Sequence, residues 1–247
     1  MEALPRPLLL GHRGAAGEAP ENTWPAFEAA RRAGMHGFEI DVLLTSDGVP
    51  AVIHDLTLTR LFRDRKAVRY MSFADLCRLD VGSHFHPRFA GEKVPRLEDV
   101  LDRYGDMVLD VEIKELNPFS ERLAEMVIEL VKERGIEDRI IISSFNPVII
   151  RKVQRLEPGI RTGFNYISDS ILHLRRAWFG LFAHTFSKHP QPGQVTRRYL
   201  GRQHRKGIRV IPWGVNHEAD ALRLLAMGAD GLISDFPGML RRIMDRG

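Results

Sequence analysis

The sequence has a single cysteine, Cys77, among its 247 residues. One cysteine excludes a disulfide within the chain and a zinc site built from several thiolates. No apolar run approaches the roughly 18 residues that a membrane-spanning helix needs. The first ten residues hold two prolines and only three consecutive leucines, which is too short for the core of a secretion signal. We therefore expect a reduced, cytoplasmic protein without stable membrane insertion.

The sequence also has little excess of charge of either sign. Its 36 lysines and arginines nearly balance its 32 acidic residues, and the net charge is +4. Basic side chains gather in the helix expected over Gln194–Lys206, where no aromatic platform accompanies them. We interpret this helix as a solvated face and expect no nucleic-acid partner. A small anionic substrate fits such a charge balance equally well.

Short apolar or alternating segments, each followed by a helical pattern, recur along the chain. The expected strands cover residues 8–10, 37–42, 107–114, 139–144, 160–164, 181–186, 207–213 and 229–234. Eight such units in about 250 residues predict a closed (β/α)8 barrel, the TIM barrel of the α/β class. An open, doubly wound sheet is the alternative, but its Gly-x-Gly-x-x-Gly signature is missing.

One long irregular stretch interrupts this alternation after the second strand. Residues 56–95 carry scattered proline, glycine and histidine, and only Ser72–Leu79 has a helical pattern there. We expect one domain over residues 1–247, with this stretch as a small insertion beside the barrel.

Polar residues follow the first three long strands at the end where a barrel places its active site. His12 and Arg13 follow the first strand between two glycines, and His54 closes a short extended piece after the second. Histidine exchanges a proton near neutral pH, and arginine offers a planar fork for phosphate. Glu39 and Asp41 are two residues apart, and so are Glu112 and Lys114. This spacing places both members of a pair on one face of a strand.

Three carboxylates meeting at one barrel mouth repel one another. Two like charges about 5 Å apart cost roughly 3 kcal/mol at an effective dielectric constant of about 20. A divalent ion would remove that cost, and all-oxygen ligands favour Mg²⁺, Ca²⁺ or Mn²⁺ over zinc. The alternative is that the carboxylates pair with Arg13 and Lys114 and hold no metal.

Several short motifs run along the chain in a characteristic order. They are Gly11-His12-Arg13-Gly14, Pro20-Glu21-Asn22-Thr23, Glu39-Ile40-Asp41, His54-Asp55-Leu56-Thr57-Leu58, Glu112-Ile113-Lys114, Trp213-Gly214-Val215-Asn216 and Gly228-Ala229-Asp230-Gly231. Together they resemble the glycerophosphodiester phosphodiesterases over nearly the whole chain. The resemblance implies a metal-dependent barrel that cleaves small glycerophosphodiesters to glycerol 3-phosphate and an alcohol.

The resemblance also implies a role for each matched residue. It assigns the metal to Glu39, Asp41 and Glu112, acid–base chemistry to His12 and His54, phosphate binding to Arg13 and Lys114, and the pocket wall to Trp213. Two other interpretations stay open, a lysophospholipase-D-like barrel acting on membrane lipids and a non-catalytic phosphate-binding barrel. An exposed lip at Trp178–Phe182 would favour the first of these. The sequence leaves the oligomeric state, monomer or dimer, undecided.

Overall fold

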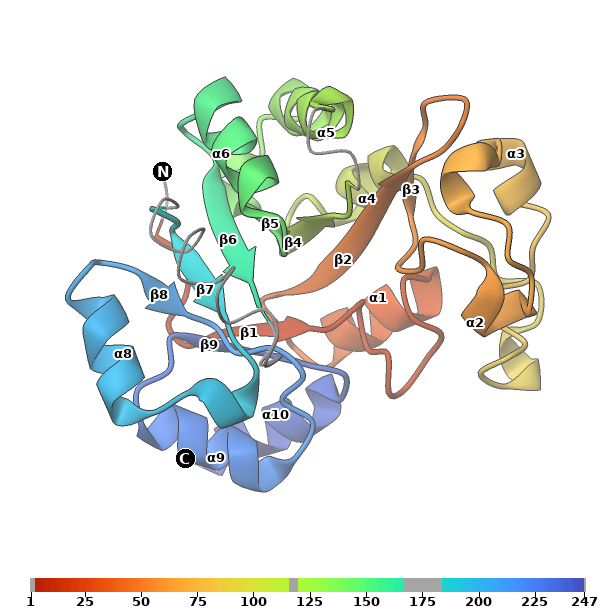
Figure 1. Ribbon diagram of the computed structural model, residues 1–247. Helices are drawn as coiled ribbons and strands as arrows, with labels where there is room; N and C mark the ends of the chain where they lie inside the picture. The colour runs from red at the N-terminus through yellow and green to blue at the C-terminus, as the bar shows by residue number, and fades with distance from the viewer. Residues whose placement is uncertain (1–2, 116–119, 167–183, 247) are drawn as a thin grey trace.

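The computed structural model describes residues 3–115, 120–166 and 184–246, which form a barrel of parallel strands with helices outside it (Figure 1). Neighbouring strands follow the order β8-β7-β6-β5-β4-β2-β1-β9. Their bounds are β1 Leu8–Gly11, β2 Gly37–Leu44, β4 Val108–Ile113, β5 Ile140–Ser144, β6 Arg161–Asn165, β7 Ser187–His189, β8 Arg209–Val210 and β9 Gly231–Ser234. The last two strands close the circle, because Asp230 N donates to Val210 O and Ile233 N to Pro212 O, both at 2.9 Å. The predicted (β/α)8 barrel is confirmed.

Amphipathic helices cover the outside of the barrel and bury their apolar faces against it. They are α1 Trp24–Arg32, α4 Leu97–Tyr104, α5 Arg122–Glu133, α6 Pro147–Leu156, α8 Arg197–His204, α9 Glu218–Ala226 and α10 Pro237–Met244. In α4, Leu97, Val100, Leu101 and Tyr104 are all buried, at the three- and four-residue spacing of a helix face. Among the described residues, no helix is long and apolar enough to cross a membrane.

Strand β7 lies further along the chain than the sixth strand that the sequence predicted. Residues 184–186 of the predicted strand 181–186 are irregular, residues 181–183 lie outside the described residues, and β7 covers Ser187–His189. Apolar Leu181 and Phe182 suggested a strand, whereas the real one turns two polar side chains inward. Ser187 and His189 are buried and hydrogen-bond each other at 2.8 Å. A strand whose inward residues are polar gives no hydrophobic signal.

The insertion begins where a short hairpin leaves the barrel. Strand β3, Pro50–Val52, pairs antiparallel with β2, and the chain reaches α4 through α2 Thr59–Phe62 and α3 Phe73–Leu76. These pieces lie together on one side of the barrel, at the right of Figure 1. They enclose an apolar cluster of their own, which includes Leu58, Val68, Phe73, Leu76 and Val94. The insertion is therefore packed firmly enough to hold its first residues, Asp55 to Arg60, against the barrel mouth.

Candidate active site

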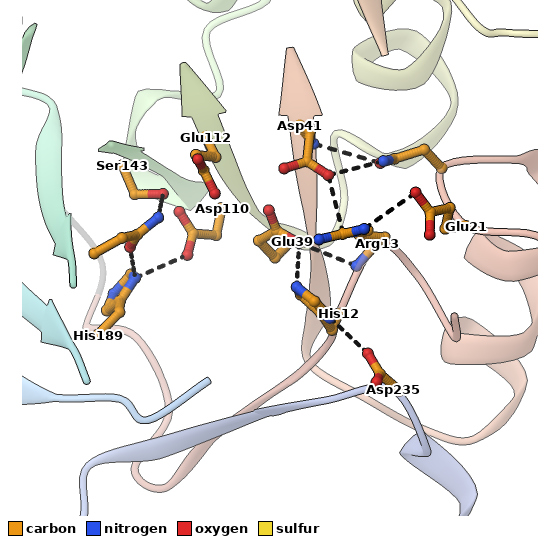
Figure 2. Close-up of polar contacts among 12 residues, drawn as sticks. His12, Arg13, Glu21, Glu39, Asp41, Asp110, Glu112, Ser143, His189 and Asp235 are labelled. Atoms are coloured by element: carbon orange, nitrogen blue, oxygen red, sulfur yellow. Dashed lines mark hydrogen bonds and ion pairs between the residues drawn. The ribbon is translucent and has the colours of Figure 1, made fainter. Parts of the chain in front are cut away.

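Three buried carboxylates lie side by side on β2 and β4 (Figure 2). The parallel register pairs Asp41 with Glu112 and Glu39 with Asp110, and the two-residue spacing of a strand turns these side chains into the barrel. One oxygen from each of Glu39, Asp41 and Glu112 lies within 4.8 Å of the other two. The structure thus brings together the three residues that the sequence singled out as metal ligands.

The three carboxylates do not share their charge equally. Burial, together with repulsion from Asp41 and Glu112, raises the pKa of Glu39 well above its usual value. Burial also raises the pKa of Glu112. Burial would raise the pKa of Asp41 as well, but Lys114 and Arg13 outweigh it and lower that pKa. Asp41 is therefore the carboxylate that is held in its anionic form, whereas the negative charge of Glu39 is the least compensated by neighbouring positive charge.

Two cations approach the triad from its rim. Lys114 Nζ lies 3.1 Å from Asp41 Oδ1 and 2.8 Å from Glu112 Oε1. Arg13 Nε lies 3.2 Å from Asp41 Oδ2, and the Arg13 backbone N–H donates to Glu39 Oε2 at 3.0 Å. Arg13 has a φ of 49°, in the left-handed region. Such a backbone conformation is strained for a side chain of this size and clusters at functional sites.

The residues present fit a divalent cation. Glu39 Oε1 is buried and has no hydrogen-bond partner among the described residues. Arg13 and Lys114 pair with Asp41, and Lys114 also pairs with Glu112, whereas the strongly raised pKa of Glu39 marks it as the carboxylate that these cations compensate least. An uncompensated buried carboxylate is costly, and an all-oxygen donor set suits a hard ion. The pairing that the alternative interpretation predicted does occur, but it is incomplete.

His12 is held from behind by a carboxylate. Its Nδ1 lies 2.5 Å from Asp235 Oδ1, and its Nε2 lies 3.8 Å from Glu39 Oε2 (Figure 2). Asn216 fixes Asp235 in turn, because its Oδ1 accepts from the Asp235 backbone N–H at 2.9 Å and its Nδ2 donates to the carboxylate. Burial alone would raise the pKa of Asp235, but the hydrogen bond with His12 lowers it. His12 therefore keeps one tautomer, with Nε2 toward the triad.

We expect Asp235→Asn to lower kcat by about 10²-fold or more, with little change in KM. The amide carries no negative charge to stabilise a charged imidazole, and if its oxygen accepts from Asn216 Nδ2, its own N–H faces His12 Nδ1 and selects the other tautomer. The measurement is the pH–rate profile of the variant beside wild type. Asp245→Asn, which changes an exposed carboxylate paired with Arg241, serves as the control. An unchanged kcat in Asp235→Asn would show that His12 needs no partner.

His54 has a matching support from the insertion. Its Nδ1 lies 2.7 Å from Asp55 Oδ1, and Arg60 Nε donates to Asp55 Oδ2 at 2.7 Å. Arg60 also pairs with Glu21, which accepts from Arg13 Nη1 at 3.1 Å. Burial lowers the pKa of His54. This chain of contacts connects His54 to Arg13 on the loop after β1, through Asp55, Arg60 and Glu21. It therefore fixes the position of His54 relative to Arg13 across the barrel mouth.

Both histidines line a cavity of about 260 Å³ together with Glu39 and Glu112, the two carboxylates that cluster with Asp41. Trp213 forms one wall, with its ring centroid 5.9 Å from that of His12, and Phe145 packs edge-on against it, also at 5.9 Å. The Trp213 Nε1–H is buried without a partner among the described residues. A buried indole N–H normally finds an acceptor, so a ligand oxygen is the expected one.

A second polar cluster lies in the same cavity and was missed as a group. His189 Nδ1 lies 2.8 Å from Asn165 Oδ1 and 3.3 Å from Asp110 Oδ2. Burial raises the pKa of Asp110 to about 8 and lowers the pKa of His189 to about 3. The alternation Ser187-x-His189 was the available signal, and the misplaced strand prediction at 181–186 hid it. The segment Trp178–Phe182 lies outside the described residues.

Carboxylate-backed histidines on both sides of an acidic triad, with two cations at its rim, define a class: a barrel enzyme for phosphate-ester chemistry. Comparison with known proteins identifies the family. The model of the glycerophosphoryl diester phosphodiesterase family matches residues 12–239, and the chain belongs to this family. The resemblance that the motifs indicated is confirmed.

Relatives and solved structures agree over the whole length. The chain is 32% identical to a glycerophosphodiester phosphodiesterase of Caldanaerobacter subterraneus, over 97% of this chain and 98% of that protein. A phosphodiesterase of Oleispira antarctica, solved with the product sn-glycerol-3-phosphate, superposes with a TM-score of 0.84 at 28% identity, covering 98% and 97% of the two chains. A human lysophospholipase D is 27% identical over 96% of this chain and 85% of its own length.

Proposed function

We propose that this protein is a single-domain, metal-dependent phosphodiesterase that hydrolyses glycerophosphodiesters to glycerol 3-phosphate and an alcohol. The observation that carries the proposal is that His12 and His54 line one cavity with Glu39 and Glu112 of the acidic triad, in a chain that belongs to this family. The product bound in the Oleispira antarctica relative supports the glycerol 3-phosphate half of the substrate.

Arg13 and Lys114 would hold the phosphate. Burial would lower the pKa of Lys114, but Asp41 and Glu112 outweigh it and raise that pKa, so the ammonium stays charged at neutral pH. Both side chains line the small cavity, and a phosphate between them would share their charge with the carboxylates. The unpartnered Trp213 Nε1–H would donate to a substrate oxygen in the same cavity.

The triad Glu39, Asp41 and Glu112 would hold Mg²⁺ or Ca²⁺, with Mn²⁺ as a further candidate. When bound, the ion supplies positive charge against the negative charge that develops on the phosphoryl oxygens. His12 and His54 act as an acid–base pair. One accepts a proton from the attacking oxygen, and the other gives a proton to the departing alcohol as the P–O bond breaks.

We further propose that the enzyme works in the cytoplasm on diesters left by phospholipid breakdown. The experiment for the activity is glycerol 3-phosphate release from glycerophosphocholine and glycerophosphoethanolamine, first with chelator and then with added Mg²⁺, Ca²⁺ or Mn²⁺. We expect release only after an ion is restored. Release that chelator leaves unchanged would contradict the metal assignment.

The same assay separates the remaining interpretations. Lysophosphatidylcholine is tested beside the two diesters under the same ions. Choline release from it alone would favour a lysophospholipase D, as in the human relative. Silence toward all three substrates, with phosphate still binding, would favour a non-catalytic barrel.

A further inference from the structure

A larger cavity opens from the small one on the insertion side. It measures about 680 Å³, and four residues line both cavities: His54, Glu112, Lys114 and Phe145. Its own walls come from the first turn of the insertion, including Leu56 and Arg60, and from the loop after β5. His12 and Trp213 line only the small cavity. The shared residues therefore lie between the two cavities. Lys114, one of the two proposed phosphate ligands, is among them.

The walls of the large cavity expose apolar surface. Leu56 is 38% exposed and Phe145 is 37% exposed, so both present apolar surface to a ligand. Both line this cavity, together with Ile113. Two of its basic groups are already paired, Arg60 with Asp55 and Glu21, and Lys114 with Asp41 and Glu112. Leu56, Ile113 and Phe145 thus offer a ligand hydrophobic contacts beside uncharged polar side chains of the same lining, such as those of Thr57, Ser144 and Asn146.

We propose that the large cavity is the leaving-alcohol subsite and that it selects diesters whose alcohol carries a hydrocarbon portion. This rests on the proposed function. The half of the substrate common to all glycerophosphodiesters is small, polar and fixed in size, which suits the 260 Å³ cavity with its buried polar groups. The half that varies needs the larger cavity, and Leu56 and Phe145 cover its methylene groups.

The test is a series of sn-glycero-3-phosphoalkanols with ethyl, butyl and hexyl alcohols, assayed as kcat/KM for glycerol 3-phosphate release with the activating ion. Full burial of a methylene contributes ~0.8 kcal/mol, and half of that corresponds to about twofold per carbon. We expect kcat/KM to rise about tenfold or more from ethyl to hexyl. Leu56→Asn and Phe145→Asn should each flatten this slope.

Leu222→Asn is the matched control, since Leu222 is exposed on α9 away from both cavities, and it should keep the wild-type slope. Equal kcat/KM for all three alcohols, or a slope that both cavity variants retain, would overturn the subsite while leaving the phosphodiesterase activity standing. If kcat/KM rose only when the alkyl chain was attached to the glycerol instead of the leaving alcohol, the large cavity would bind the glycerol side, and the proposed subsite would be overturned. No release from any diester by wild type would instead remove the proposed function, and the subsite with it.

Discussion

Replacing either His12 or His54 with alanine is expected to lower kcat for glycerophosphocholine by 10³-fold or more. Both imidazoles line the small cavity, and a carboxylate lies against the Nδ1 of each, at 2.5 Å for His12 and 2.7 Å for His54. Positioned acid–base groups contribute about 10²–10⁴-fold each. His84→Ala, an exposed histidine of the insertion, is the control and should leave kcat unchanged.

A substrate with a good leaving group separates the two histidines. The large cavity is lined by His54 and not by His12, so the leaving-alcohol subsite makes His54 the proton donor. A bound phosphodiester anion beside His54 favours its protonated form and opposes the effect of burial. With a p-nitrophenyl diester, which needs no proton on departure, we expect His54→Ala to recover most of its rate and His12→Ala to stay impaired. Recovery of His12→Ala alone would assign the roles the other way.

Glu39→Gln is expected to have opposite effects on the protein with and without metal. Wild type should gain about 2.7 kcal/mol of unfolding free energy at an ion concentration of 100 times Kd, which corresponds to roughly 5–10 °C in Tm. The variant should lose most of that gain. Without metal it should be more stable than wild type at neutral pH, because burial and the neighbouring carboxylates raise the pKa of Glu39, and its Oε1 has no hydrogen-bond partner among the described residues.

The pH dependence follows from the raised pKa of Glu39. A carboxyl group whose pKa is raised on folding stabilises the protein fully below its unfolded value, 4.5. That contribution is lost as the pH rises through the folded pKa. The metal-free wild type should therefore lose stability from about pH 4.5 upward, and Glu39→Gln should lose less, as measured by denaturant unfolding with chelator.

Asp110→Asn is the matched control for the metal. Asp110 is a fully buried carboxylate of the same cavity, and burial raises its pKa to about 8, but it is not one of the three clustered ligands. This variant should also stabilise the metal-free protein at neutral pH, yet it should keep the response to the ion. If Glu39→Gln kept a full Tm response, Glu39 would not be a metal ligand.

Much of the fold and site could be predicted because strand ends and their spacing are local properties. Glu39 with Asp41, and Glu112 with Lys114, lie two apart on strands whose apolar neighbours mark them clearly. Parallel strands in a barrel then bring these ends together without further information. The three carboxylates consequently cluster as the sequence indicated, while their roles in binding metal remain proposals.

Residues that act through another side chain escaped the same reasoning. Asp235 lies 223 positions after His12, and only barrel closure by β9 brings the two into contact. Asp55 follows His54 directly, but a neighbour in sequence does not reveal that its side chain turns back to Nδ1. His189 was missed because its strand is short and its inward residues are polar. Pairing through tertiary contacts leaves no periodic signal.

The most direct test of the central claim is an anomalous difference map from crystals of this protein soaked with Mn²⁺ and glycerol 3-phosphate. We predict one ion bound by oxygens of Glu39, Asp41 and Glu112, with the phosphate against Arg13 and Lys114 and the glycerol toward Trp213. An ion bound elsewhere would contradict the account. So would a triad that holds no ion at saturating Mn²⁺ and keeps Lys114 paired with Asp41 and Glu112.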